Sequence, residues 1–290
     1  MADSASMADL RAEDVQRVVT GFALQEYKMK QIVMTKTGSA WSEVFYQETA
    51  ADLTGGTGSN VKGIPRFANF PYGEVTWTKQ TGVTLKHGME GTISWEDSML
   101  NNVDVIARTL LRISRAVAKS VDDTIWETIS EGQTATNINS VAIGAGDEWN
   151  SATVANRDPI QNILDAIKEI TENNYNPYNN GYLLVNPKDF ANLLGNANIR
   201  NAGQFYTADV TKNGRVGTLL GLTVIVSNSV TADYALVCVG GECGTWVEAE
   251  ALKVETITRK GIDHTIRAWE LGQCQLTNPK SITLVSNTSI

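Results

Sequence analysis

Residues 73–131 combine a long strand pattern with a long helix pattern, and this pairing constrains the fold more than any other feature of the chain. Apolar side chains alternate with polar residues or glycine along one stretch, at Val83, Leu85, Met89, Ile93 and Trp95. A period of two is typical of a strand with one buried face. At about 3.3 Å per residue, the segment from Val83 to Trp95 would span roughly 43 Å, which is long for a compact domain.

The helix pattern follows a short acidic break at Glu96 and Asp97. Its apolar positions recur at spacings of three and four, at Ile106, Leu110, Ile113, Val117, Val121 and Ile125. The stripe predicts a helix from Asn102 to Glu131, roughly 45 Å long at about 1.5 Å per residue. Two elongated elements in series, neither with an evident catalytic group, favour a building block over an enzyme.

Composition and charge argue against several other classes of protein. The net charge of −8 disfavours tight, sequence-independent binding of nucleic acid, which relies on Lys and Arg. No apolar run approaches eighteen residues, so we expect no membrane partner, and Met1 to Asp9 lacks the apolar core of a signal peptide. Three cysteines in so long a chain are not a disulfide framework, which favours a reducing compartment.

The sequence predicts an arm and an extended loop ahead of the long strand. Ala8 to Lys30 is helix-prone, and it packs either on something outside its own domain or on its own chain. Gln47 to Tyr72 has little periodicity and includes the glycine-rich segment Thr54 to Asn60, while its flanks, 33–46 and 75–95, have strand character. We expect a two-stranded arm with a glycine-rich tip, which needs a neighbour because an isolated hairpin is marginal in water.

A compact α/β section is predicted after the long helix. Gly132 to Asn156 is expected to be a connection, and Asp158-Pro159 then opens a helix with a cap followed by proline. Its apolar stripe comprises Ile160, Ile163, Leu164, Ile167 and Ile170. A shorter helix is expected from Asn186-Pro187 to Leu194, and strands are expected at Tyr182–Val185, Leu222–Val226, Tyr234–Val239, Trp246–Arg259, Thr265–Gln275 and Ser281–Val285.

The residues that usually carry chemistry are scarce. His87 lies on the apolar side of the long strand, where a hydrogen-bonded structural role is expected, and His264 flanks a turn and is expected to be solvated. Cys238 and Cys243 lack metal-ligand spacing, and both Cys238 and Cys274 fit a core. We therefore predict no catalytic residue, no cofactor-binding residue, no metal ligand and no cofactor, so the protein is not expected to be an enzyme.

Two glycine-rich segments and one basic stripe need separate interpretations. Thr54 to Asn60 lacks a Gly-Lys-Ser/Thr ending, and Gly240 to Gly244 precedes a strand instead of a helix, so both are interpreted as turns and not as nucleotide sites. The basic stripe lies at helical spacing on the predicted long helix and comprises Arg108, Arg112, Arg115 and Lys119. Its side chains are either solvated or paired with acidic side chains, or they contact nucleic acid or acidic residues of a neighbouring subunit.

The order of elements resembles the major capsid protein of tailed bacteriophages and related archaeal viruses, the Hong Kong 97-type fold. Four segments carry the local similarity. Gly73–Thr81 is similar to the returning strand of that family's extended loop, and Ile93–Leu100 is similar to the entry into its spine helix. Val185–Phe190 is similar to a strand-to-helix turn of its axial domain, and Gly221–Val226 is similar to a strand that heads toward its peripheral domain. The similarity rests mainly on the order and lengths of elements over nearly the whole chain.

The resemblance implies an α+β fold with four regions. These are an N-terminal arm at 1–46, an extended β-hairpin loop at 47–85, a peripheral domain with the spine helix at 86–132 and 246–275, and an axial domain at 133–245 and 276–290. It implies a structural protein that forms pentamers and hexamers of an icosahedral or prolate shell around double-stranded viral DNA. The shell would be the capsid of a virion assembled in the host cytoplasm, with a portal and decoration proteins as further expected partners.

Two properties of some family members are not expected for this chain. Some members link an extended-loop lysine to an asparagine near the peripheral turn. Lys62 is a candidate lysine, but Gly261 to Thr265 contains no asparagine. Many members carry a long N-terminal scaffolding segment, whereas this sequence reaches the loop within about fifty residues, so a scaffold is expected to be a separate protein.

Two alternatives stay open from the sequence. An encapsulin-type cellular compartment uses the same fold and would need an inner groove for cargo peptides. A soluble enzyme or ligand-binding protein would need a pocket with convergent titratable groups, which the scarcity of His and Cys disfavours.

Overall fold

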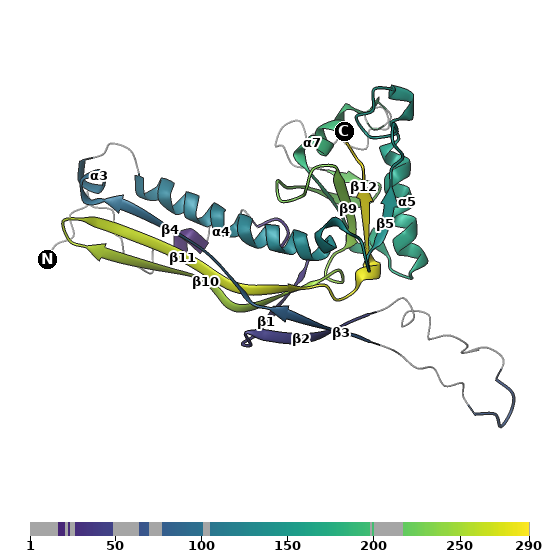
Figure 1. Ribbon diagram of the computed structural model, residues 1–290, viewed down its shortest axis with the longest axis horizontal. Helices are drawn as coiled ribbons and strands as arrows, with labels where there is room; N and C mark the ends of the chain where they lie inside the picture. Colours follow the sequence, from purple (N-terminus) through teal and green to yellow (C-terminus); the bar gives the residue numbers. More distant parts are fainter. Residues whose placement is uncertain are drawn as a thin grey trace.

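The computed structural model describes residues 17–20, 23, 27–48, 64–69, 77–100, 105–197, 199 and 217–289. An elongated ribbon of strands lies beneath a long helix, and a second unit of sheet and helices stands at one end of that helix (Figure 1). Within the described ranges, no helix is long and apolar enough to span a membrane.

The elongated unit is a four-stranded sheet with strand order β1-β10-β11-β4. Its strands are β1 (Met34–Thr37), β4 (Leu85–Ser94), β10 (Thr245–Arg259) and β11 (Asp263–Gln275). β10 and β11 form the long antiparallel ribbon that the sequence predicts, and its turn lies within a residue or two of the expected place. The register of β10 shifts between Glu248 and Glu250 and again before Lys253, which marks bulges in the middle of the ribbon.

Helix α4 (Val105–Ile129) lies along this sheet and confirms the predicted stripe. Leu110, Ile113 and Val117 are buried with Ile93 and Ile266 of the sheet. Gly91 permits the close approach, because a Cβ there would lie 2.7 Å from Thr109 and 3.0 Å from Ile113.

The helix ends two residues before the predicted Glu131. Residues 131–133 have positive φ, so the backbone leaves the helical conformation there. The predicted start at Asn102 lies outside the described residues.

The predicted single strand from Val83 to Trp95 is wrong in its details. The chain forms β3 (Thr78–Val83), breaks at Thr84 and continues as β4, because β3 pairs with β2 (Ser42–Gln47) whereas β4 pairs with β11. His87 and Ile93 face the core as expected, but Val83 and Leu85 are exposed. Trp95 begins the short helix α3 (Trp95–Leu100) instead of ending the strand.

The second unit is a six-stranded sheet with strand order β5-β12-β9-β6-β8-β7. Its members are β5 (Asn139–Ala142), β6 (Gly181–Val185), β7 (Thr218–Leu219), β8 (Leu222–Val226), β9 (Tyr234–Val239) and β12 (Ile282–Ser286). β9 alternates between two cores: Ala235, Val237 and Val239 join the core on the α5 side, whereas Leu236 and Cys238 join the core that contains the end of α4. β5 was missed, because the segment from Gly132 to Asn156 was expected to be a connection.

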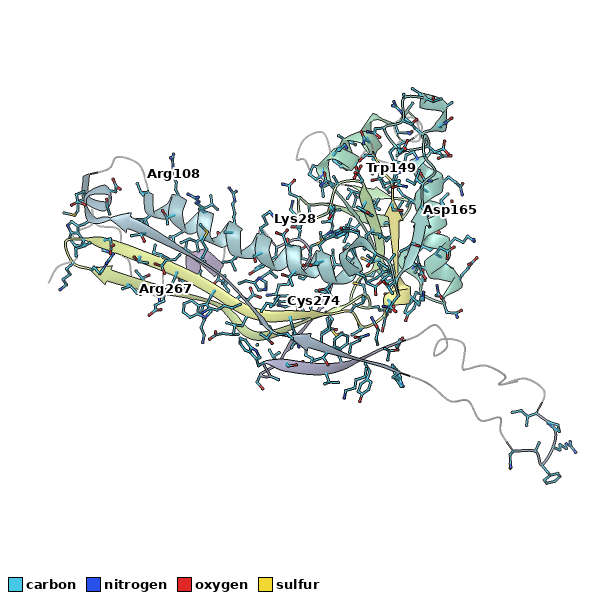
Figure 2. All side chains as sticks on the ribbon, viewed as in Figure 1. Lys28, Arg108, Trp149, Asp165, Arg267 and Cys274 are labelled. Atoms are coloured by element: carbon cyan, nitrogen blue, oxygen red, sulfur yellow. The ribbon has the colours of Figure 1, made fainter. Side chains whose placement is uncertain are left out.

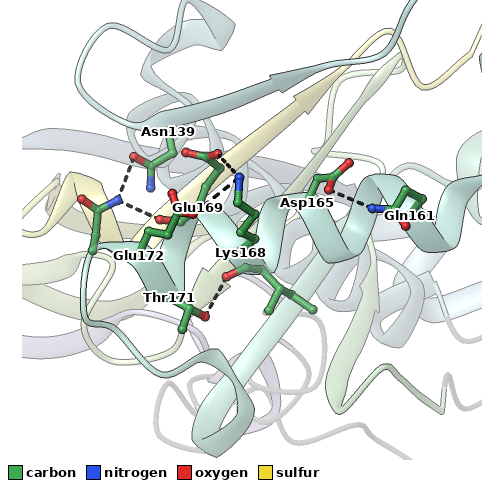
Figure 3. A network of polar contacts seen from close by, with 9 residues as sticks. Asn139, Gln161, Asp165, Lys168, Glu169, Thr171 and Glu172 are labelled. Atoms are coloured by element: carbon green, nitrogen blue, oxygen red, sulfur yellow. Dashed lines mark hydrogen bonds and ion pairs between the residues drawn. The ribbon is translucent and has the colours of Figure 1, made fainter.

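Helices α5 (Pro159–Glu172), α6 (Pro177–Asn180) and α7 (Pro187–Gly195) complete this unit. Asp158 caps α5 as predicted, accepting a hydrogen bond from the N–H of Gln161 at 3.1 Å. The solvent side of α5 carries pairs one turn apart, Gln161 with Asp165 and Lys168 with Glu172, and Asn173 joins the helix end to Asn139 (Figure 3). Leu164 of the predicted stripe is partly exposed, and α6 was not predicted.

The described part of the N-terminal arm docks on its own chain. Val19 is fully buried against α4 and the ribbon, and Ala23 joins the core below the end of α4. This is the second of the two placements that the sequence left open. The rest of the predicted helix-prone segment, and the glycine-rich segment Thr54 to Asn60, lie outside the described residues.

Candidate functional site

A buried polar cluster ties the N-terminal segment to the ribbon. Glu270 of β11 is fully buried and accepts hydrogen bonds from the Tyr27 hydroxyl at 2.5 Å and the Trp246 indole N–H at 3.2 Å. The Lys30 ammonium lies 2.7 Å from the same carboxylate and 4.9 Å from the centre of the Tyr27 ring. Burial, reinforced by the charge of Glu270, raises the pKa of Tyr27, so the phenol stays protonated and donates. No pattern in the sequence indicates this cluster, because its partners come from three distant segments.

Replacing Glu270 by alanine is expected to destabilise the protomer by about 3–5 kcal/mol, because the Tyr27 hydroxyl and the Trp246 N–H lose their buried acceptor and Lys30 keeps only the more distant Glu248, at 3.6 Å. A matched control is Glu90→Ala, which removes an exposed ion pair with Arg267 at 3.1 Å and should cost at most about 1 kcal/mol. Denaturant unfolding of both variants measures the difference. Equal losses would mean that the buried cluster contributes no more than a surface pair.

A second buried carboxylate holds the same N-terminal segment against α4. Asp122 accepts hydrogen bonds from the backbone N–H groups of Lys28 at 2.9 Å and Met29 at 3.1 Å. Burial raises the pKa of Asp122 to about 6, although the backbone donors favour the charged form. The side chain therefore serves as an anchor for the backbone and not as a free surface charge.

The hairpin of β2 and β3 contacts its own chain through polar groups. The Gln273 and Gln275 amides donate to Glu43 at 3.4 and 3.3 Å, and the Gln47 amide donates to the Leu276 carbonyl at 3.2 Å. The inner side of the hairpin is therefore mostly polar. The sequence predicts a two-stranded arm from the strand character of both flanks, and the pairing of β2 with β3 confirms its stem. Most of the predicted tip lies outside the described residues.

The opposite side of the hairpin exposes three large apolar side chains. Val44, Tyr46 and Val83 are 45%, 58% and 53% exposed. The pairing of Ser42 with Val83 and of Val44 with Thr81 places these side chains on one side of the two-stranded sheet. We call this surface, Val44, Tyr46 and Val83, the outer hairpin face. Their cross-strand partners on the same side are the polar residues Ser42, Thr81 and Lys79, so the face combines large exposed apolar side chains with polar ones. A protein surface often uses such a mixture to contact another protein. Sequence alternation could indicate two faces here but not which one is turned outward.

The histidines occupy structural positions. His87 accepts or donates a hydrogen bond through Nδ1 to the Ser120 hydroxyl at 2.9 Å, as expected, and burial lowers its pKa. His264 is partly exposed and stacks on Trp95 with ring centres 5.2 Å apart, so the solvation expected from the sequence holds for part of its surface and not for all of it. The difference arises because Trp95, on the strand-to-helix junction beside the turn, covers one face of the imidazole.

All three cysteines are buried thiols in one core. A hydrogen bond with Cys243 and burial raise the pKa of Cys238, and burial raises the pKa of Cys274 to about 12. Thiols held in the protonated form are poor nucleophiles and poor metal ligands. In the part of the chain that the structure describes, no group of three or more His, Cys, Asp or Glu side chains could hold a metal ion.

Comparison with known proteins agrees with an assembling protomer. The family model for a phage capsid protein matches residues 78–280, more than two thirds of the chain. A search of curated proteins found no match.

Solved structures share the fold over nearly the full chain. The capsid of the cyanophage P-SCSP1u has a TM-score of 0.66 and 14% identity, covering 99% of this chain and 92% of that one. The virus-like particle from Pyrococcus furiosus has a TM-score of 0.63 and 11% identity, covering 94% and 98%. A phage-related protein from Bordetella bronchiseptica has a TM-score of 0.64 and 12% identity, covering 98% and 99%.

An α+β protomer with a ribbon, a long helix and an outward-facing apolar hairpin is a building block of a protein shell. The chain belongs to the phage capsid protein family and is a structural protein of the virion capsid. The Hong Kong 97-type fold expected from the resemblance is confirmed.

Proposed function

We propose that this chain is the major capsid protein that assembles into pentamers and hexamers of a closed icosahedral or prolate shell around double-stranded viral DNA, without catalysing a reaction. The outer hairpin face carries this proposal. A protomer that turns Val44 and Tyr46 toward solvent while binding its own chain through glutamines and Glu43 offers these side chains for contact with another copy. The family match supports a viral shell over the encapsulin alternative.

We also propose the division of the protomer into the four regions expected from the resemblance. The arm would occupy 1–46, the extended loop 47–85, the peripheral domain 86–132 and 246–275, and the axial domain 133–245 and 276–290. The two separate sheets support a boundary between peripheral and axial domains, since β10 and β11 belong to one sheet and β9 and β12 to the other. Assembly would take place in the host cytoplasm, and scaffolding, decoration and portal components would be separate proteins.

Electron microscopy of the purified protein tests the proposal directly. We expect hollow particles of uniform diameter, and we expect particles from infected cells to protect double-stranded DNA from nuclease. Light scattering that finds only monomers in all salt conditions, with and without the other head proteins of the virus, would contradict shell formation. Uniform particles that enclose protein cargo in place of DNA would favour the encapsulin alternative.

We predict that no covalent bonds form between subunits during maturation. The turn between β10 and β11 contains no asparagine, and Asp263 next to it is engaged by the Arg259 guanidinium. Lys62, the candidate loop lysine, lies outside the described residues. Mature particles boiled in detergent under reducing conditions should therefore run as a single band at the mass of one protomer. A ladder of multimers under those conditions would contradict this prediction.

A further inference from the structure

The basic stripe predicted on the long helix is present and turned toward solvent. Arg108, Arg112, Arg115 and Lys119 are all exposed, whereas Leu110, Ile113 and Val117 between them are buried against the ribbon. Arg108 points away from the strands, and Lys28 lies in the inner corner between α4 and the six-stranded unit (Figure 2). The stripe therefore runs along the side of α4 opposite the ribbon.

Within the described residues, Arg108 and Arg112 of this stripe are less neutralised than Arg267 on the ribbon. On the open face of the ribbon, Arg267 lies between two glutamates, 3.1 Å from Glu90 and 3.9 Å from Glu255. On α4, Lys119 pairs with Asp123 at 2.7 Å, but within the described residues Arg108 and Arg112 make no ion pair or side-chain hydrogen bond. The N-terminal half of the stripe, Arg108 and Arg112, thus keeps its positive charge available for a partner.

The stripe leads into a hollow at the junction of α4 with the six-stranded unit. The hollow is about 260 Å³ and is lined by Lys28, Arg115 and Lys119 together with Asp122 and the loop 227–229. Asp122 brings one negative charge against the three cations of this lining, and its oxygens already accept the backbone N–H groups of Lys28 and Met29. The loop adds serine hydroxyls and an asparagine amide, which can donate to an anion.

The dimensions of the stripe suit a nucleic-acid duplex. From Arg108 to Lys119 the helix rises about 16 Å at about 1.5 Å per residue. A duplex presents about nine phosphates over that length, at one charge per ~1.7 Å of its axis. The chain as a whole carries a net charge of −8, so a cluster of exposed cations on one side of α4 stands out against an acidic average.

We propose that Arg108, Arg112, Arg115, Lys119 and Lys28 form a basic track that binds the sugar-phosphate backbone of double-stranded DNA, and that this side of α4 is therefore the inner surface of the shell. The proposal rests on the proposed function, since it assumes a shell that encloses DNA. The track recognises charge and spacing and carries no base specificity, because only backbone contacts are available to it.

Binding of a 30-base-pair duplex of mixed sequence to the full-length, unassembled protein tests the track. The variant R108Q/R112Q should weaken binding by tens of fold at about 0.1 M salt. The slope of the logarithm of the binding constant against the logarithm of the salt concentration should become shallower by about 1.8, because each lost phosphate contact contributes about 0.9 to that slope. R108K/R112K keeps both charges and should bind nearly as well as the unmodified protein. K168Q/K260Q removes the same charge from exposed positions elsewhere and should leave binding unchanged.

Two further measurements separate this proposal from its alternatives. Electron microscopy should find that R108Q/R112Q still forms shells. If it abolishes shells and leaves duplex binding unchanged, the stripe contacts a neighbouring subunit and the track is wrong. Equal weakening by K168Q/K260Q, or an unchanged salt slope for R108Q/R112Q, also overturns the track. In those cases shell formation by the unmodified protein still supports the proposed function. If the unmodified protein binds the duplex through the track but forms no shells, the proposed function and the inner-surface assignment both fail, and only the duplex-binding site is left.

Discussion

Replacing Val44 and Tyr46 by serine is expected to give a stable, folded protomer that no longer closes shells. Both side chains are largely exposed in the single chain, so their loss removes little from the protomer core. In an assembled shell, we expect each to be covered by a neighbouring copy, where a buried side chain of this size contributes about 1.5–3 kcal/mol. The loss is repeated at every subunit contact, so assembly should fail cooperatively.

The matched control removes exposed apolar side chains from another surface. Val154 and Leu164 are 68% and 36% exposed on the second unit, and V154S/L164S should assemble normally. Thermal unfolding reports the stability of both variants, and negative-stain microscopy reports shells. Normal shells from the hairpin variant would mean that this face is not an assembly surface. Loss of the cooperative melt would mean that the hairpin belongs to the protomer core.

Leu110→Asp is expected to prevent the protomer from folding. Leu110 is 6% exposed and lies in the core between α4 and the ribbon, with Ile93 and Ile266. A carboxylate there would lack a hydrogen-bonding partner, and burying an unpaired polar group in addition to losing the leucine costs several kcal/mol. This is comparable to the whole stability of a typical domain, about 5–15 kcal/mol.

Arg112→Asp places the same charge on the exposed side of the same helix and should remain soluble with a cooperative melt. Expression in the soluble fraction and circular dichroism distinguish the two outcomes. Soluble, normally melting Leu110→Asp protein would show that the assignment of the buried face of α4 is incorrect. Insolubility of Arg112→Asp as well would show that any acidic residue on α4 is disruptive.

Periodicity within a single element could be interpreted correctly from the sequence. The strands β8 and β9 begin and end where their apolar runs do, and the Asp158 cap locates the start of α5 because its side chain satisfies a backbone N–H of the first turn. The stripe of α4 was also recognised, since a spacing of three and four residues that continues over most of a 25-residue segment matches the period of a helix and not that of a strand.

Features that depend on two distant segments could not be predicted in the same way. The strand pattern through Val83 continues across Thr84, but the pairing partner changes there from β2 to β11, and alternation alone contains no information about partners. β5 is short and lies in a Gly- and Ser-rich stretch, and it becomes a strand only because β12 provides its hydrogen bonds.

The same limit applies to the candidate site. Sequence alone placed Arg108, Arg112, Arg115 and Lys119 on one side of a helix, and that side is exposed. It did not associate Lys28 with them, because a separate packing contact through Asp122 brings the N-terminal segment to α4. The outer hairpin face was equally hidden, since its identity depends on which side of the hairpin meets Gln273 and Gln275.

The strand order has a consequence for how the chain emerges from the ribosome. β10 and β11 lie at the centre of the four-stranded sheet, yet β10 starts at residue 245, whereas α4 ends at residue 129. β4 precedes α4 and also packs on it, but at about 5–20 residues per second the part of the apolar side of α4 that β11 covers waits roughly 6–23 s before even β10 begins. During that interval the sides of Leu110, Ile113 and Val117 that later contact Ile266 and Ala268 are uncovered, so high-level synthesis should make this protein depend on chaperones that shield helical apolar surfaces.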